Sequence, residues 1–153
     1  MKKENFNIVL VHPQIPNNTG NIGRLCVGSQ SKLHLVKPLG FEITDTRVKR
    51  AGLDYWRDLD LKYYDDFEAL LNSIPDKSRM FFFTTRATSD YYDINFKKGD
   101  WLIFGRESNG LSPEIVHRFS NQCVKIPFPG KVRSFNLSNA VAMAMGEGLR
   151  QFR

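Results

Sequence analysis

Apolar residues form short continuous runs along the chain, separated by stretches in which they recur every three or four positions. Continuous runs bounded by polar or turn-forming residues are typical of strands buried on both faces of a sheet. They predict strands at residues 6–11, 33–36, 80–85, 101–104 and 124–126. The periodic stretches predict amphipathic helices at about residues 19–29, 65–74 and 138–152.

Polar residues mark where several helices are expected to begin. Asn17-Asn18-Thr19 supplies N-cap chemistry for the first long helix, whose Ile22 and Cys26 share one face. Ser112-Pro113 predicts the start of a short helix, because serine is a good N-cap residue and proline suits the first helical position. The basic segment 44–57 is also predicted to be helical.

Strands therefore alternate with helices from end to end, which predicts an α/β fold with a mostly parallel sheet flanked by helices. Residues 1–153 are expected to form one domain, since this is the usual length of one. Ligands of such sheets bind beyond the C-terminal ends of the strands. The candidate sites are therefore the loops after Val11, Phe83, Phe104 and Ile126.

The composition is that of a folded, basic protein. Apolar residues make up 41% and charged residues 25%, which excludes a fibrous or mostly disordered chain. The 22 Lys and Arg residues exceed the 16 Asp and Glu residues, and the net charge is +6. Such an excess favours polyanionic partners, with nucleic acid as the first candidate, but a basic surface without such a partner is an open alternative.

Cysteine and histidine usage argues against several other kinds of chemistry. Cys26 and Cys123 lie in apolar surroundings and form no CxxC pair, which indicates a reducing compartment and disfavours a catalytic thiol. The 3 histidines lack metal-ligand spacing, so no metal site is predicted. The N-terminus predicts no signal peptide, and no apolar run approaches the length of a membrane span. We expect a cytoplasmic protein.

The first candidate loop, residues 18–24, combines glycines with a cation. Gly20 and Gly23 are predicted to lie at the N-terminus of the first helix, where free backbone N–H groups attract an anion, with Arg24 nearby. A phosphate of RNA fits this arrangement. The spacing matches neither the dinucleotide-binding fingerprint nor the P-loop, so an ordinary helix start is an equal alternative.

Two later loops also follow predicted strands. Gly105 and Gly110 bracket polar residues, which suits close backbone approach to a flat ligand, and Glu107 is placed to fix an arginine or a ligand hydroxyl. A plain surface turn is the alternative. Residues 126–139 contain two prolines and a glycine and end on closely spaced polar side chains, more than a simple connection needs.

These three loops, in this order, resemble the three motifs of the SPOUT superfamily of S-adenosylmethionine-dependent RNA methyltransferases. The chain looks most like the minimal, single-domain group that methylates the ribose 2′-oxygen of the wobble nucleotide in tRNA. Three further stretches carry this resemblance: Ile8-Val9-Leu10, residues 13–26 and residues 45–55. The similarity runs across nearly the whole chain.

The resemblance implies a sheet whose C-terminal part is threaded as a deep trefoil knot. It also implies S-adenosylmethionine as methyl donor, S-adenosylhomocysteine as product, no metal, and a wobble cytidine or uridine of tRNA as target. A homodimer is implied too, and Gly146 and Gly148 fit it: each costs about 1 kcal/mol of helix propensity, a cost that is more easily understood when another backbone packs close by. An rRNA ribose methyltransferase and a non-catalytic knotted RNA-binding or ribosome-assembly factor stay open as alternatives.

Roles follow from the resemblance residue by residue. Arg24 matches an invariant arginine and is expected to clamp a phosphate and stabilise developing negative charge, while Ser134 and Asn136 orient cofactor and hydroxyl. Cofactor contacts are expected at Thr84, Thr85, Gly105, Glu107, Gly110, Ile126, Ser134 and Leu137. RNA contacts are expected at Asn18, Arg24, Arg47, Lys49, Arg50, Arg106, Lys131 and Arg133. For each cation among these, a solvated surface position is the alternative.

The chain departs from the wobble-nucleotide group at a few positions. That group usually has Gly-Pro-Glu-Thr-Arg-Gly in the second motif, whereas Arg106 here replaces the proline and Asn109 the arginine, so a cation is kept but shifted by three residues. Its usual Tyr-Glu before the first proline is Val11-His12, and a tyrosine of the last helix is Gly146. These differences leave the expectation of cofactor binding intact and the target nucleotide open.

Overall fold

A computed structural model describes residues 3–153, except for the side chains of residues 49 and 52–54. Within this part of the chain, one sheet has the strand order β3-β2-β1-β5-β4-β6. The strands are β1 (Phe6–Val11), β2 (Lys32–Val36), β3 (Leu61–Tyr64), β4 (Met80–Phe83), β5 (Asp100–Phe104) and β6 (Cys123–Val124). Every neighbouring pair is parallel, which confirms the predicted parallel sheet.

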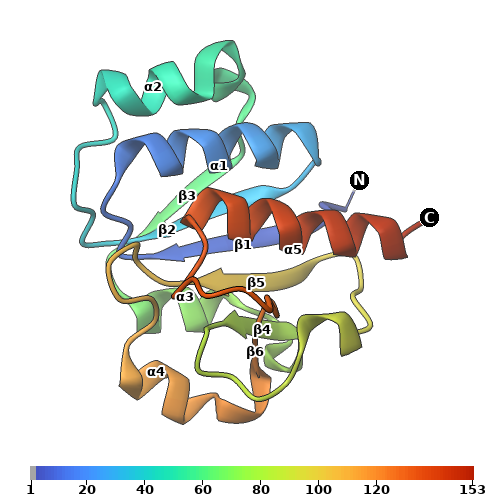
Figure 1. The fold of residues 1–153 in the computed structure, drawn as a ribbon. Coiled ribbons are helices and arrows are strands. Elements are labelled where there is room, and N and C mark those ends of the chain that lie inside the picture. The colour runs from blue at the N-terminus through green and yellow to red at the C-terminus, as the bar shows by residue number, and fades with distance from the viewer. Residues whose placement is uncertain (1–2) are drawn as a thin grey trace.

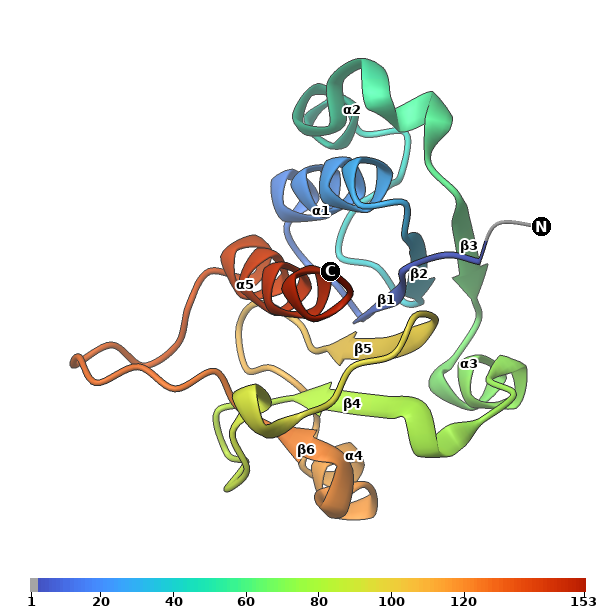
Figure 2. The same cartoon turned by 90° about the vertical axis from the view of Figure 1, so that its right-hand side faces the viewer.

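Helices cover both faces of the sheet (Figures 1 and 2). They are α1 (Pro16–Gly28), α2 (Thr46–Gly52), α3 (Phe67–Ser73), α4 (Pro113–Arg118) and α5 (Leu137–Gln151). Helices α1 and α5 lie on one face, α3 and α4 on the other, and α2 packs on the outside of α1. No helix in the described part of the chain is long and apolar enough to cross a membrane.

The sheet separates two apolar cores, because successive side chains of a strand point to opposite faces. Phe6, Ile8 and Leu10 of β1 pack in the core with residues of α1 and α5. Val9 and Val11 of the same strand pack in the core with residues of α3 and α4. All residues of β1 are buried, which explains the nearly continuous apolar run in the sequence.

A buried polar cluster lies between β1, β2 and β3. The His34 ring donates from Nε2 to Asn7 Oδ1 over 2.8 Å, and its Nδ1 accepts from the Tyr64 hydroxyl over 2.7 Å, the tautomer being the one these partners require. Burial, together with the charges of Lys32 and Lys62, lowers the pKa of His34 to about 3. The imidazole is therefore neutral at pH 7.

Two strands differ from expectation. β3 was not expected because it is an edge strand whose Lys62 and Tyr63 are exposed, so it lacks the apolar run of a central strand. β6 covers Cys123–Val124 in place of residues 124–126, because Lys125 leaves β4 and forms an isolated bridge with Asp90. The remaining strands overlap their expected ranges.

The predicted N-cap at residues 17–19 is wrong. Helix α1 begins at Pro16, and its N-cap residue is Ile15, whose side chain makes no capping hydrogen bond. Proline at the first helical position has no N–H to satisfy, so the helix starts there and the polar triplet lies within its first turn. The predicted cap at Ser112 is confirmed, because its side chain accepts a hydrogen bond from the Ile115 N–H.

The early start of α1 also changes the role of its glycines. Gly20 and Gly23 lie inside the helix and are buried, so the predicted anion site at these glycines is wrong. Instead, Gly23 lets the 3₁₀ segment Leu53–Asp58 approach, since a Cβ at Gly23 would lie 2.9 Å from a ring carbon of Trp56. The basic segment expected to be helical is α2 followed by this 3₁₀ segment.

The connection from β4 to β5 encloses the chain that leaves β6. On one side Val124 pairs with Phe83 of β4. On the other, Lys125 N donates to Ser89 O over 2.9 Å and Lys125 O accepts from Tyr91 N over 2.9 Å. Residues 123–125 therefore lie between β4 and residues 89–91, and the chain continues from there to α5.

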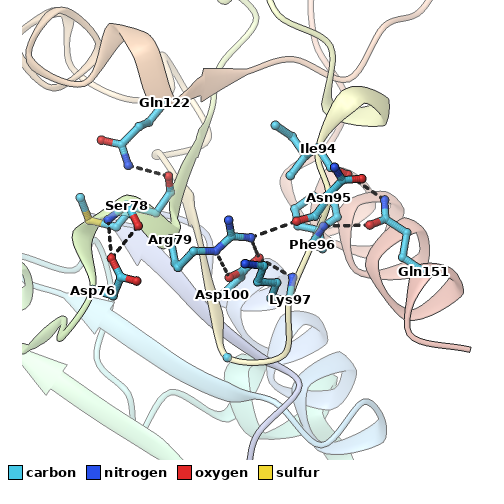
Figure 3. A network of polar contacts seen from close by, with 12 residues as sticks. Asp76, Ser78, Arg79, Ile94, Asn95, Phe96, Lys97, Asp100, Gln122 and Gln151 are labelled. Atoms are coloured by element: carbon cyan, nitrogen blue, oxygen red, sulfur yellow. Dashed lines mark hydrogen bonds and ion pairs between the residues drawn. The ribbon is translucent and has the colours of Figure 1, made fainter.

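The far end of the same connection is fixed by a polar network, shown in Figure 3. Asp100, 1% exposed, binds the Arg79 guanidinium through Nε over 2.8 Å and Nη2 over 2.6 Å, and also accepts from the Lys97 N–H. Gln151 of α5 accepts from Phe96 N and donates to Ile94 O. The connection is thus tied to Arg79, which directly precedes β4 and also donates to Asn95 O, and to α5.

Candidate functional site

The loops that follow β4, β5 and β6 meet at the C-terminal ends of the strands and enclose a cavity of about 440 Å³. This is the place where parallel α/β sheets bind ligands. We call it the knot cavity. Its lining comprises Phe83, Thr84, Thr85, Arg86, residues 104–110, Ile126, Phe128, residues 133–135, Leu137 and Ala140.

Every position predicted to contact a cofactor lies in this lining. Those positions are Thr84, Thr85, Gly105, Glu107, Gly110, Ile126, Ser134 and Leu137. Arg106 and Arg133, predicted to contact RNA, line the cavity as well. Sequence reasoning missed Arg86 and Phe128, although Arg86 directly follows two threonines already singled out.

The cavity offers aromatic surface together with hydroxyl and backbone groups. The Phe83 and Phe104 rings stack with centroids 4.7 Å apart, and the Phe128 and Phe135 rings meet at 4.4 Å. Thr84, Thr85 and Ser134 add hydroxyls. Aromatic rings beside hydroxyl and charged groups suit a flat, partly polar organic molecule.

Gly105 is required by the way its own loop folds back. A Cβ at Gly105 would lie 2.0 Å from the carbonyl carbon of Gly110 and 2.1 Å from the nitrogen of Leu111. The turn is closed by Gly110 N donating to Arg106 O over 2.9 Å, and Gly110 has a φ of 68°, which glycine adopts without strain. This tight turn brings loop backbone to the wall of the cavity.

Glu107 joins the second loop to the first. Its carboxylate accepts hydrogen bonds from the N–H groups of Gln14 and Ile15, both over 2.8 Å, and from the Asn18 side-chain amide over 3.3 Å. Of the two roles expected for Glu107, fixing an arginine is wrong, because its carboxylate fixes the residues that precede α1. A negative charge there also interacts favourably with the helix dipole, and it replaces the side-chain cap that Ile15 lacks. A contact with a ligand hydroxyl stays a prediction.

Asn136 extends this chain of contacts to the third loop. Its amide nitrogen donates to Asn18 Oδ1 over 3.2 Å, and its own oxygen caps α5 by accepting from the N–H groups of Ser138 and Asn139. The side chains of Glu107, Asn18 and Asn136 therefore link all three loops that the sequence singled out. Asn136 does not belong to the described cavity lining.

The other predicted RNA-contacting residues lie away from the knot cavity. Arg24 is exposed on α1, with its guanidinium carbon 5.1 Å from the centre of the Tyr55 ring. Arg47 forms an ion pair with Asp45 over 2.9 Å, and this hydrogen-bonded contact lowers the pKa of Asp45. Arg50 and Lys131 are exposed, whereas the side chain of Lys49 is outside the described part.

Comparison with known proteins places this arrangement among RNA-modifying enzymes. Residues 5–146 match the model of the SpoU rRNA Methylase family. Proteins named tRNA (cytidine(34)-2'-O)-methyltransferase from Burkholderia pseudomallei (strain 1106a) and Burkholderia cenocepacia (strain HI2424) are 46% and 47% identical over 148 residues. Each alignment covers 95% of this chain and 95% of the relative.

A solved structure supports the same assignment of fold. It is described as "Structural insights into the 2-OH methylation of C/U34 on tRNA" and superposes with a TM-score of 0.92 at 44% identity. The match covers 96% of this chain and 95% of that one. The likeness confirms the expected fold class, a parallel α/β sheet with a C-terminal trefoil knot, and the enclosed segment after β6 is where the threading occurs.

Proposed function

Because the chain belongs to the SpoU rRNA Methylase family, we propose that it transfers the methyl group of S-adenosylmethionine to the ribose 2′-oxygen of the wobble nucleotide, cytidine or uridine 34, of tRNA. The observation that carries the proposal is the knot cavity, whose lining contains every expected cofactor position. The near full-length relatives named as tRNA cytidine-34 methyltransferases support the substrate. We assign the activity to one domain, residues 1–153, working on tRNA in the cytoplasm.

The residues of the knot cavity fit S-adenosylmethionine. A volume of about 440 Å³ lies in the range of about 300–1,000 Å³ usual for small-molecule pockets. The paired phenylalanine rings suit the adenine base, and Thr84, Thr85 and Ser134 offer hydrogen bonds to its polar edges and the ribose. When bound, the cofactor supplies a methyl group already activated by a positively charged sulfur, so the protein contributes alignment and help with the proton.

Glu107 and Asn136 act as positioning residues in this proposal. The Glu107 carboxylate and the Asn136 amide hold the three loops against one another, because both bind the side chain of Asn18. Neither the carboxylate nor the Asn136 amide is therefore free to bind RNA in this arrangement. Gly105 and Gly110 bring backbone groups to the wall. Ser134, which lines the cavity, orients the cofactor.

Arg24 supports a dimeric active site. In our proposal the Arg24 guanidinium stabilises negative charge on the reacting oxygen. In its own protomer, however, this guanidinium packs against the Tyr55 ring, and Arg24 does not line the knot cavity. A second copy that places Arg24 at the partner's cavity would complete the site. We therefore propose a homodimer in which each active site takes its cofactor residues from one protomer and Arg24 from the other.

Methyl transfer to bulk tRNA from cells lacking this gene tests the substrate. With S-adenosylmethionine present, nucleoside mass spectrometry should detect new 2′-O-methylcytidine or 2′-O-methyluridine, mapped to position 34. A parallel reaction with rRNA tests the alternative that the family description suggests. Cofactor binding by calorimetry without any new 2′-O-methyl nucleoside would support the non-catalytic alternative and refute the proposal.

Arg24→Ala tests the catalytic role. The single-turnover rate at saturating tRNA should fall about 100-fold, the effect of losing one charge-stabilising donor, while Arg118→Ala, an exposed arginine of α4, serves as the control. An unchanged rate would refute the role of Arg24.

Subunit mixing tests the shared site. Arg24→Ala and Gly105→Ala protomers, each inactive alone, should regain about a quarter of the wild-type sites when co-expressed, because half of the randomly mixed dimers contain one intact site. No recovery in heterodimers isolated with two different tags would refute a site shared between subunits.

A further inference from the structure

A second cavity of about 360 Å³ adjoins the knot cavity. Arg86, Arg106, Asn109 and Gly110 line both and form a shared rim. The rest of its lining is Val11, His12, Leu111, Ser112, Pro113 and Ile115. Apart from Gly110 on the shared rim, no expected cofactor position lines this second cavity, and the proposed mechanism gives it no role.

The charges of this cavity are of one sign. Arg86 and Arg106 contribute guanidinium groups, and none of the described residues that line it is acidic. The nearest carboxylate along the chain, Glu107, has its oxygens bonded to the N–H groups before α1. Arg86 is fixed in place, because its Nη2 donates to the Leu111 carbonyl oxygen. The rim therefore presents positive charge, partly immobilised before any ligand arrives.

His12 adds a second, independent sign of a binding site. Its Nδ1 is buried and has no hydrogen-bond partner in the described part of the chain, although buried polar atoms are nearly always paired. Its φ is 57°, an uncommon value for a non-glycine residue and especially for one that precedes a proline. Unpaired buried polar atoms and strained backbone both tend to occur at binding sites.

We propose that the second cavity binds one phosphodiester of the substrate RNA, between the Arg86 and Arg106 guanidinium groups and beside the His12 ring. Arginine pairs with phosphate through two parallel hydrogen bonds, and His12, which lines the same cavity, adds a polar side chain beside them. A phosphodiester is bonded directly to a ribose, and the shared rim adjoins the knot cavity. Anchoring this phosphate therefore holds the neighbouring ribose hydroxyl next to the methyl donor. This inference rests on the proposed function, since it takes RNA as the substrate.

Methylphosphonate substitution identifies the phosphate. A fluorescent anticodon stem-loop RNA is made with one neutral methylphosphonate linkage at a time around nucleotide 34, and its binding is measured by anisotropy. Wild-type protein should lose about 10-fold in affinity at one linkage, the size of a lost charged hydrogen bond. The double variant Arg86→Gln/Arg106→Gln should bind all of these RNAs equally, because it has already lost that contact.

Salt dependence gives a second measure on unmodified RNA. Removing one phosphate contact reduces the slope of log affinity against log salt by about 0.7 for single-stranded RNA. The double variant should lose no more slope than either single variant, because both arginines hold one phosphate. The control Lys98→Gln removes an exposed cation before β5, at the opposite end of the strands, and should leave both measurements unchanged.

His12 is tested by a pair of substitutions that both tolerate a positive φ. His12→Gly removes the ring and should weaken RNA binding severalfold, whereas His12→Asn keeps a polar atom close to the position of Nδ1 and should restore most of the affinity. Calorimetry with S-adenosylmethionine should give the wild-type affinity for both His12 variants, because His12 lines the second cavity and does not belong to the lining of the knot cavity.

Several results would overturn the proposal. If every methylphosphonate linkage lowers the RNA affinity of wild-type protein equally, the arginines attract RNA without holding one particular phosphate. Loss of S-adenosylmethionine affinity with unchanged RNA binding would assign the cavity to the cofactor. Failure of the proposed function is a separate result, because wild-type protein would then bind the stem-loop without methylating it.

Discussion

Replacing Glu107 with glutamine tests whether one carboxylate holds the first and second loops together. The two side chains have the same shape, but the amide group replaces one acceptor oxygen with an NH₂ donor. The carboxylate accepts from the N–H groups of Gln14 and Ile15, both over 2.8 Å, and from the Asn18 amide over 3.3 Å. In the variant, an NH₂ group must therefore face at least one backbone N–H.

The expected magnitude follows from these contacts. The amide will turn so that its oxygen faces Ile15 and Asn18, since Oε2 serves both, and only the bond to Gln14 is lost outright. A hydrogen bond to a charged group contributes about 1.5–3 kcal/mol, and the two remaining bonds weaken because the acceptor becomes neutral. We expect the free energy of unfolding to fall by about 2 kcal/mol.

Urea unfolding followed by circular dichroism measures this change, and calorimetry measures S-adenosylmethionine binding. Because Glu107 belongs to the wall of the knot cavity, cofactor affinity should fall about fivefold, or ~1 kcal/mol. Glu42→Gln is the matched control, an exposed glutamate whose side chain has no hydrogen bond in the described part of the chain. If the free energies of unfolding of Glu107→Gln and Glu42→Gln agree within about 0.5 kcal/mol and both variants bind cofactor equally, the connecting role of Glu107 is wrong.

Three further predictions concern other parts of the fold. His34 is neutral in the folded protein, where its pKa is lowered to about 3, but it titrates near pH 6.5 when unfolded. Its contribution to stability is therefore complete well above the unfolded pKa and is lost as pH falls. Urea titrations should show a loss of about 2 kcal/mol from this group between about pH 8 and 5, absent in His34→Gln. A pH dependence identical in both proteins would contradict this. Gly105→Ala forces a Cβ to 2.0 Å from loop backbone and should abolish calorimetric binding of S-adenosylmethionine, whereas Gly130→Ala, with open space around it, should not. Equal binding by both would refute the close approach. Gly148→Ala places a Cβ 2.1 Å from the ring of Phe6 in the core and should cost about 1–3 kcal/mol of stability. Gly146→Ala meets open space in the same chain and should gain up to about 1 kcal/mol of helix propensity. Thermal unfolding distinguishes the two signs, and a stabilised Gly148→Ala would disprove the packing argument.

Much of the sheet could be predicted from sequence, because central strands buried on both faces leave continuous apolar runs. β1, β4 and β5 are of this kind. β3 is not, since an edge strand with exposed Lys62 and Tyr63 looks like any polar segment. The cavity positions came from resemblance to a family, because no periodicity can reveal that the chain after β6 passes inside the connection between β4 and β5.

The start of α1 shows a limit of local sequence patterns. Asn17-Asn18-Thr19 has the composition of an N-cap, yet the group that neutralises this helix end is Glu107, which lies in another loop. Capping rules consider neighbours in sequence, whereas the carboxylate arrives through tertiary structure. The same contact moves the glycines of the first motif from a helix end into a helix interior, where Gly23 serves packing against Trp56.

The shifted cation of the second motif is explained by the turn that carries it. The resemblance to the wobble-nucleotide group leads one to expect proline where Arg106 stands and arginine where Asn109 stands, so the charge looks displaced along the sequence. In the structure Gly110 N donates to Arg106 O over 2.9 Å, so the chain reverses between these positions. Arg106 and Gly110 also form an isolated antiparallel bridge. The side chains of Arg106 and Asn109 line the same two cavities. Moving the charge by three residues therefore keeps it on the shared rim, which is why the loss of an arginine at position 109 is compatible with phosphate binding there.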